Sequence, residues 1–248
     1  GMTLLERYID DISNIWKNVF GIGTGNEAAS AGHTSGRIES ESEVTVQLAI
    51  QSRQPSVSVQ IWKEYTDQIE ISLINPSGVR VGPVPEVLGS QRFRIGQTEI
   101  LLYYGKPSPY STSQEIYIDF LPAESYLTEG IWRIVLTSGK IVTGQYEMWL
   151  PGDAVLNRGT GFLFPTDRTT LTIPSSASRV ISVGAYDART FAYADFSGRG
   201  FTRLTNLVKP DLVAPGVEVV TATTGGGYAA KIPGLSKIPV IGPILFNY

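Results

Sequence analysis

The chain has 248 residues, of which 42% are hydrophobic and 17% are charged, and its formal net charge is −3. This composition indicates a folded globular protein with one large domain or two modest ones. The slightly acidic balance gives no electrostatic reason to expect nucleic acid or an anionic membrane as a partner. The absence of cysteine excludes disulfides and thiolate metal sites. No apolar run approaches the roughly 20 residues that span a bilayer, and we expect no export signal at the start of this sequence.

The first predicted element is an amphipathic helix over residues 3–18, laid against a core. Its apolar residues recur at spacings of three and four, and charged residues fill much of the other face. An apolar run with three glycines follows at 19–26 and predicts a buried strand that ends in a tight turn. A helix, a short loop and a buried strand form half of a βαβ unit, which favours a parallel sheet covered by helices.

From about residue 41 the sequence changes to a period of two. Apolar and polar residues alternate at 43–50, 57–61, 69–73, 116–120, 131–136 and 145–150. Turn clusters rich in Gly, Pro and Ser separate these runs. Short alternating strands at nearly regular spacing predict an antiparallel β-sandwich of the jelly-roll or immunoglobulin type. We place this domain at 38–165.

After residue 165 the strict alternation stops. The segments 179–187 and 217–223 are short apolar runs, as expected of buried strands in an α/β sheet. The predicted architecture is therefore a partial α/β domain, residues 2–37 and 166–248, interrupted by an antiparallel β-sandwich insertion at 38–165.

Three segments outside the sandwich resemble subtilisin-like serine peptidases and occur in that family's order. The sequence GIGTGNEA at 21–28 resembles the strand and loop that supply the oxyanion-hole asparagine. Residues 170–187 are similar to the family's Pro-small-Ala strand, and residues 196–228 carry Phe-Ser-x-Arg-Gly, Lys-Pro-Asp and Ala-Pro-Gly. The β domain after the Gly-Asn-Glu segment narrows the resemblance to the clostridial subgroup that includes the germination proteases.

The resemblance implies a partial subtilisin-like domain and peptide-bond hydrolysis by Ser, His and Asp. It implies that the Asn26 amide donates a hydrogen bond to the oxyanion. It also implies that Gly23, Thr24 and Gly25 line one wall of the primary specificity pocket. Read without the family, Asn26 could simply cap a turn after Gly25. No cofactor or metal is expected, and the expected partner is a peptide or protein.

The resemblance does not extend to a catalytic triad. The only histidine, His33, lies in a polar loop outside the family's motif, and we expect it to be solvated. Ser236 stands in Gly-Leu-Ser-Lys, but the prolines around it forbid the helix that follows the family's nucleophile. We therefore expect this chain to be inactive alone. The acidic residues Asp187, Asp195 and Asp211 fall at family positions that are structural, so we do not expect a hydrolytic pair of carboxylates.

Two functions remain open from the sequence. The first is a fragment of a subtilisin-family endopeptidase, and the second is a non-catalytic interaction protein whose sandwich binds a protein or glycan. Several sandwich aromatics could form a sugar platform, although their positions in alternating runs favour packing between sheets: Trp62, Tyr103, Tyr104, Tyr117, Trp132 and Trp149. An uncovered sheet and an apolar tail at 238–246 also predict self-association.

Overall fold

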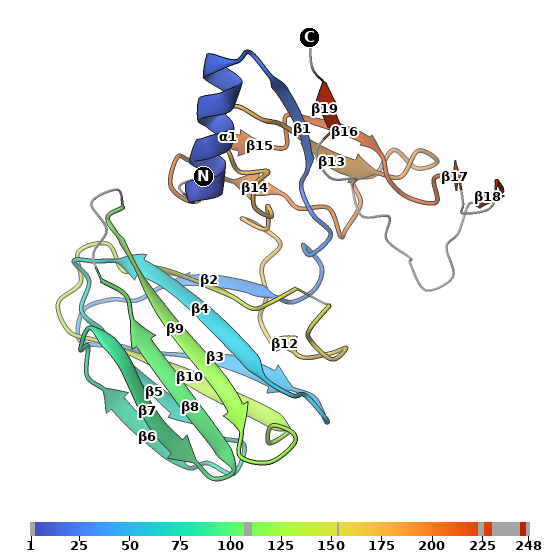
Figure 1. Cartoon of the computed structure of the whole chain (residues 1–248). Helices are drawn as coiled ribbons and strands as arrows, with labels where there is room; N and C mark the ends of the chain where they lie inside the picture. Colours follow the sequence, from blue (N-terminus) through green and yellow to red (C-terminus); the bar gives the residue numbers. More distant parts are fainter. Residues whose placement is uncertain (1–2, 107–110, 153, 223–225, 230–243, 247–248) are drawn as a thin grey trace. The chain divides into compact units, whose positions relative to one another are not determined.

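The computed structural model describes residues 3–106, 111–152, 154–222, 226–229 and 244–246 (Figure 1). These residues form mostly β-strands, and they contain a single α-helix. The chain divides into two compact units. The "split unit" comprises residues 1–29 and 167–248, and the "sandwich unit" comprises residues 30–166. The predicted division lay at 37/38, but strand β2 (His33–Arg37) pairs with β11 inside the sandwich unit.

The main sheet of the split unit has a parallel part, as the sequence predicted. Strands β1 (Val19–Gly23), β13 (Ile181–Tyr186) and β16 (Leu212–Pro215) run parallel to one another, with β13 in the middle. Strand β19 (Ile244–Phe246) pairs antiparallel with the other edge of β1. Two short antiparallel pairs complete the unit: β14 (Gly200–Phe201) with β15 (Val208–Lys209), and β17 (Thr221–Ala222) with β18 (Tyr228–Ala229).

The prediction of a buried strand at 217–223 was wrong. The parallel strand comes earlier, at Leu212–Pro215, and the chain leaves it at Gly216, whose N–H donates to the Tyr186 carbonyl. Within the described part of that segment, 217–222, only Thr221–Ala222 is part of a strand, and Val220 is 61% exposed. Of these described residues, only Val217 packs against a core cluster, so the apolar composition of the run did not indicate a buried strand.

Helix α1 (Leu4–Ile15) begins with a capping box, in which Thr3 and Glu6 satisfy each other's backbone N–H groups. Ile9 and Ile12 pack against a cluster that contains Phe20 and Ile22 of β1. The prediction of a helix laid against a core holds only for this part of its apolar face. The remaining large apolar side chains of the helix and its C-cap are exposed: Leu4, Leu5, Tyr8, Ile15 and Trp16.

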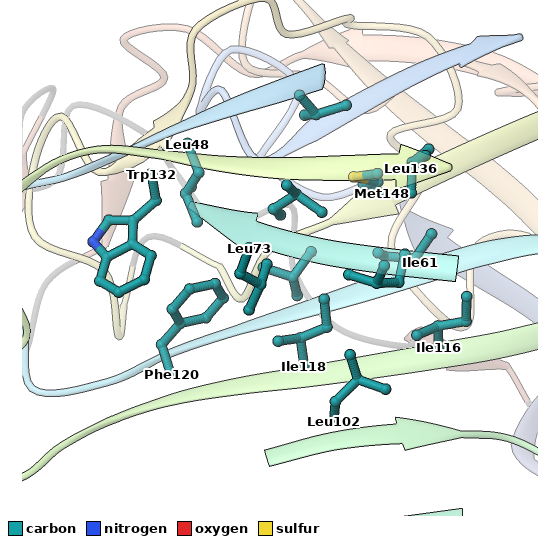
Figure 2. Close-up of a cluster of buried hydrophobic side chains, with 14 of the residues drawn as sticks. Leu48, Ile61, Leu73, Leu102, Ile116, Ile118, Phe120, Trp132, Leu136 and Met148 are labelled. Carbon is teal, nitrogen blue, oxygen red and sulfur yellow. The ribbon is translucent and has the colours of Figure 1, made fainter. Parts of the chain in front are cut away.

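The sandwich unit consists of two antiparallel sheets. One has the order β2 (His33–Arg37), β11 (Gln145–Trp149), β4 (Val57–Glu64), β9 (Ser113–Pro122), β8 (Thr98–Tyr104), β7 (Gly89–Ile95). The other has the order β12 (Gly161–Phe162), β3 (Glu43–Ile50), β10 (Gly130–Ser138), β5 (Ile69–Ile74), β6 (Arg80–Val84). Figure 2 shows side chains of both sheets meeting in one core, among them Ile61, Leu73 and Trp132.

Five of the six alternating runs predicted from the sequence fall within strands, and the run 145–150 extends one residue beyond β11, so the antiparallel strands of this region are confirmed. Strands β2, β6, β7, β8 and β12 were not predicted. The jelly-roll topology itself stays a prediction.

The first and last segments of the sandwich unit are hydrogen-bonded to each other. The Phe162 N–H donates to the Ala31 carbonyl at 2.9 Å, and the Thr166 N–H donates to the His33 carbonyl at 2.8 Å. Between them, the Gly32 carbonyl accepts a bond of 2.8 Å from the N–H of Leu150. We call these three bonds the clasp. They bring the entry and exit of the unit side by side.

Candidate functional site

The four residues that the sequence singled out lie at the carboxyl end of β1. Gly23 is the last residue of the strand and stands opposite Val183 of β13. The Thr24 N–H donates to the Val183 carbonyl at 3.1 Å, so the parallel pairing continues one residue beyond the strand. In open parallel sheets, functional groups gather at the carboxyl ends of the strands. Gly23, Thr24, Gly25 and Asn26 therefore occupy a position suited to a binding or catalytic site.

Thr24 is completely buried and belongs to a network of hydroxyl groups. Its Oγ1 lies 3.1 Å from Ser197 Oγ, which donates to the Tyr193 hydroxyl at 3.0 Å and accepts from the Ala185 N–H at 2.9 Å. Since Ser197 has one proton and gives it to Tyr193, Thr24 must be the donor to Ser197. The Tyr193 hydroxyl in turn donates to the Gly198 carbonyl at 2.7 Å. Every proton in this network therefore has an acceptor.

Gly25 requires glycine for two reasons. Its φ of +93° lies in a region that residues with a Cβ rarely adopt, and an added Cβ would come within 2.4 Å of Thr172 Cγ2. The Gly25 carbonyl also accepts the N–H of Gly198 at 3.2 Å. The backbone here is consequently held close to both neighbouring segments.

Asn26 follows directly and is half-buried. The backbone on both sides of it is bound to residues 196–198, through the Gly25–Gly198 bond and through the Ala28 N–H, which donates to the Phe196 carbonyl at 3.1 Å. Asn26 is thus fixed between two anchor points on the Phe-Ser-x-Arg-Gly segment. The family resemblance identified that segment, but sequence reasoning missed the role of Ser197 and Tyr193 in holding the loop.

His33 was expected to be solvated in a loop, and the structure contradicts this. It is 3% exposed, belongs to β2 and stacks on Trp149, with ring centroids 4.6 Å apart and an interplanar angle of 16°. His33 and Trp149 are direct cross-strand neighbours, which explains the stacking. The residues around His33 are polar and give no strand pattern, so the sequence did not reveal that this segment pairs with the strand that contains Trp149.

The three acidic residues considered as carboxylate candidates have separate partners. Asp187 binds Arg189 at 3.1 Å, and Asp195 accepts the N–H of Phe196 at 2.9 Å. Asp211 accepts a bond of 2.6 Å from the buried Lys209. Burial opposes ionisation of Asp211, but hydrogen bonds from Lys209 and Ser182 outweigh it and lower its pKa. Each of the three carboxylates is thus engaged by a neighbouring group of its own.

The sandwich aromatics are divided between the two sides of their sheets. Tyr104 and Trp132 are buried in the core, while Trp62, Tyr103, Tyr117 and Trp149 are partly buried. Tyr103 and Tyr117 are direct cross-strand neighbours.

Ser236 lies outside the described residues. Within the part of the chain that the structure describes, no group of three or more His, Cys, Asp or Glu residues could hold a metal ion. No described helix has the length and hydropathy needed to cross a membrane.

Comparison with known proteins gives two findings and one negative result. Residues 157–236 match the model of the subtilase family, peptidase family S8. The solved structure of the Clostridium perfringens CspB protease superposes with a TM-score of 0.85 and 32% sequence identity over 93% of this chain. The resemblance to clostridial subtilases is confirmed. No curated protein matches the chain.

The subtilase likeness extends over both units, because the alignment with the CspB protease covers nearly the whole chain. The chain spans 48% of the length of that protease chain. The family-model match contains the Ser197–Gly198 anchor of the candidate site, and the β1 end lies outside it. The family model therefore supports only the segment around Ser197, whereas the likeness of the β1 end to subtilases is supported by the structural match alone.

Proposed function

We propose that this chain carries the oxyanion donor and part of the specificity pocket of a subtilisin-like serine endopeptidase, and that it does not hydrolyse peptides by itself. One observation carries the proposal: Gly-Thr-Gly-Asn ends a parallel strand and is bound to a Phe-Ser-x-Arg-Gly segment at Ser197 and Gly198. The 32% identity to the CspB protease supports the same reading.

In this proposal the Asn26 side-chain amide donates to the negative oxygen of the tetrahedral intermediate. Because the loop is bound on both sides of Asn26, the donor needs little reorganisation when charge develops on the substrate oxygen. Gly23, Thr24 and Gly25 form one wall of the pocket for the substrate side chain. The Thr24 hydroxyl bonds to Ser197, and Gly25 has no side chain, so the backbone is the surface offered to substrate.

The proposed inactivity of the chain alone rests on the histidine base and the serine nucleophile that a subtilisin-like peptidase needs. The single histidine stacks on Trp149 in the sandwich unit, and no Gly-Thr-Ser nucleophile motif occurs in the sequence. A fluorophosphonate probe should leave the pure chain unlabelled, while active subtilisin in a parallel tube is labelled, and peptide turnover should stay at background. Stoichiometric labelling that disappears after heat denaturation would refute the proposed inactivity.

The role of Asn26 is testable in an active protease that contains these residues. Asn26→Ala should lower kcat by about 10²–10³, as loss of the corresponding donor does in subtilisin, and should leave KM nearly unchanged. The melting temperature serves as the control, because a cap on a turn would stabilise the fold without touching kcat. A fall in melting temperature with unchanged kcat would make Asn26 a structural cap.

A second candidate is a non-catalytic interaction protein that binds a peptide, protein or glycan through the sandwich. The observation that favours it is that the sandwich unit has a continuous core of its own, with Trp132 and Ile118 fully buried. Probe labelling cannot separate the two candidates when both are inactive. A specific ligand of the sandwich would favour the second.

Self-association is a further part of the proposal. The exposed fractions of Leu4, Ile15 and Trp16 are 87%, 68% and 72%, so one face of α1 presents apolar surface to solvent. Such surface is typical of protein contacts. Light scattering should give a mass above that of the 26.9 kDa monomer. A clean monomer mass would exclude self-association at the concentration measured.

A further inference from the structure

A groove lies at one end of the sandwich unit, far in sequence from the subtilase motifs. Its volume is about 720 Å³, which falls within the usual range of small-ligand sites. Three segments enclose it: the turn from β4 to β5, the connection from β6 to β7, and the end of β10. The residues that matter for its chemistry are Tyr65, Glu70, Glu86, Leu88, Thr137 and Gly139.

A buried lysine lies beside this groove. The Lys63 side chain is 1% exposed, and its Nζ donates to the Asp67 carbonyl and lies 3.5 Å from Glu86 Oε1. Burial lowers the pKa of Lys63, and the carboxylate of Glu86 opposes that shift. An ammonium in such a place requires a nearby anion. Glu86 is the carboxylate that pairs with Lys63, and its side chain remains 24% exposed at the groove.

Glu70 supplies a second carboxylate to the lining of the groove. Burial raises the pKa of the Tyr104 hydroxyl, and the negative charges of Glu86 and Glu70 both add to that rise. Both residues line the groove. Since Lys63 supplies a single positive charge, the three side chains together have a formal charge of −1. None of the groove's lining side chains is cationic.

The lining of the groove is mixed, and two of its side chains offer exposed apolar surface. Tyr65 is 38% exposed, and Leu88 is 47% exposed. A tyrosine ring can receive a cation on its face, and a leucine can contact methylene groups. Together with two carboxylates, these two side chains suit the charge and the methylene stem of a long basic side chain.

The turns around the groove are fixed by internal hydrogen bonds. The Asp67 carboxylate accepts the N–H groups of Val142, Thr143 and Gly144 at 2.6, 2.9 and 2.8 Å. The Gly139 N–H donates to the Gln68 carbonyl at 2.9 Å. The groove therefore exists before a ligand arrives, which reduces the entropy cost of binding.

We propose that this groove binds a lysine or arginine side chain of a peptide, with Glu70 and Glu86 facing the cation and Tyr65 and Leu88 contacting the aliphatic stem. The proposal is independent of peptidase activity. It makes the sandwich unit a recognition module for basic peptide segments.

The test is an NMR titration of the whole ¹⁵N-labelled chain with Nα-acetyl-arginine amide and, separately, with its neutral citrulline analogue. The arginine probe should shift the amide signals of Thr66, Gln68, Leu88 and Gly139, and the citrulline analogue should bind at least about tenfold more weakly, because it lacks the charge. Glu70→Gln should weaken arginine binding about tenfold. Glu99→Gln is the matched control, since Glu99 pairs with Arg92 at 3.1 Å outside the groove.

Glu86→Gln is unsuitable as the main variant, because it leaves the buried Lys63 without its anion and threatens the fold. Tyr65→Ser is the second binding variant, since its side chain lies at an exposed turn. Equal binding of the citrulline analogue would overturn the proposal. So would an affinity unchanged in both Glu70→Gln and Tyr65→Ser, or an absence of shifts at the groove when the arginine probe is at its solubility limit.

Discussion

The two units of this chain hold their folds in different ways. In the sandwich unit, side chains from both sheets form one continuous apolar core that includes Trp132 and Phe120 (Figure 2). In the described part of the split unit, the apolar clusters are small, one around Phe20 and another around Phe196. The split unit also leaves large apolar residues exposed, among them Trp16 at 72%.

Buried polar contacts take a larger share of the work in the split unit. Thr24 and Ser197 are both fully buried and bonded to each other, and Lys209 is buried against Asp211. Such contacts fix a geometry well, but each contributes only about 1 kcal/mol net. The comparison teaches that the unit with the candidate site is specified by directional bonds, whereas the sandwich is stabilised by burial.

The largest expected effect is in the sandwich core. Trp132 is fully buried, donates to the Thr128 carbonyl and meets the Phe120 ring edge-on at 5.2 Å. Trp132→Ala should cost about 3–5 kcal/mol of unfolding free energy. Trp16→Ala, at the exposed end of α1, should change it by less than about 0.5 kcal/mol. Urea unfolding followed by circular dichroism measures both, and similar costs would break the proposed contrast.

Asp67 contributes to the sandwich through polar contacts instead of apolar burial. Asp67→Ala removes the acceptor for three backbone N–H groups and should cost about 3 kcal/mol. Asp67→Asn keeps one carbonyl oxygen and should cost less. The shift of the urea midpoint at constant m-value gives both numbers. An alanine variant as stable as wild type would show that water replaces the carboxylate.

Gly25→Ala tests the site loop and should cost about 1–3 kcal/mol of local stability. The added Cβ meets both a positive φ and the Thr172 side chain. Gly78→Ala is the matched control, with a φ of +89° but no atom within 4 Å of its Cβ, so it should cost less. Hydrogen exchange at Thr24 and Gly198 reports on the loop. Equal costs at the two glycines would mean that Thr172 moves aside freely.

The smallest expected effects are changes of unfolding free energy with pH, and they have opposite signs for one carboxylate in each unit. The pKa of Asp211 is lowered, so its stabilisation is present above its ordinary value of 3.8 and is lost as the pH falls through the folded value. Burial raises the pKa of Glu115, and a bond from Gln60 only partly offsets it. Its stabilisation is therefore present below its ordinary value of 4.5 and is lost as the pH rises through the folded value.

Unfolding curves between acid and neutral pH should show both slopes, each below about 1 kcal/mol. Asp211→Asn should flatten the acid loss, and Glu115→Gln should remove the decline above the ordinary carboxyl range. The same slope in both variants would contradict the assignment.

Much of the sandwich was predictable because each sheet has one face buried in the core and one face more exposed to solvent. That condition forces alternation, as in β4, where Val57, Val59 and Ile61 are buried between more exposed neighbours. Strand β8 was missed because its apolar residues follow one another without alternating with polar ones. Strand β2 was missed because it contains no apolar residue. Both are strands by virtue of their pairing partners, which a local pattern does not contain.

The strand end and the turn at the candidate site were predictable from the sequence, whereas the contacts that hold the turn were not. The roles of the site residues stay a prediction. Glycine and asparagine at the end of an apolar run indicate a strand that ends at a special turn. The bonds that hold this turn come from Ser197 and Gly198, more than 170 positions away. The prediction that His33 is solvated was wrong for the same reason, since its burial depends on Trp149. Contacts at such separation are decided by the fold.

The clasp has a consequence for how such a chain could arise. Because residues 31–33 bond to Phe162 and Thr166, the sandwich closes on itself before the chain leaves it. A protein that receives the sandwich as an insertion therefore needs to accommodate two chain ends that lie close together, as it would for a short loop. Gain, loss or exchange of the whole module between genes is therefore possible in one recombination event, and a protein engineer could swap it at the same two points.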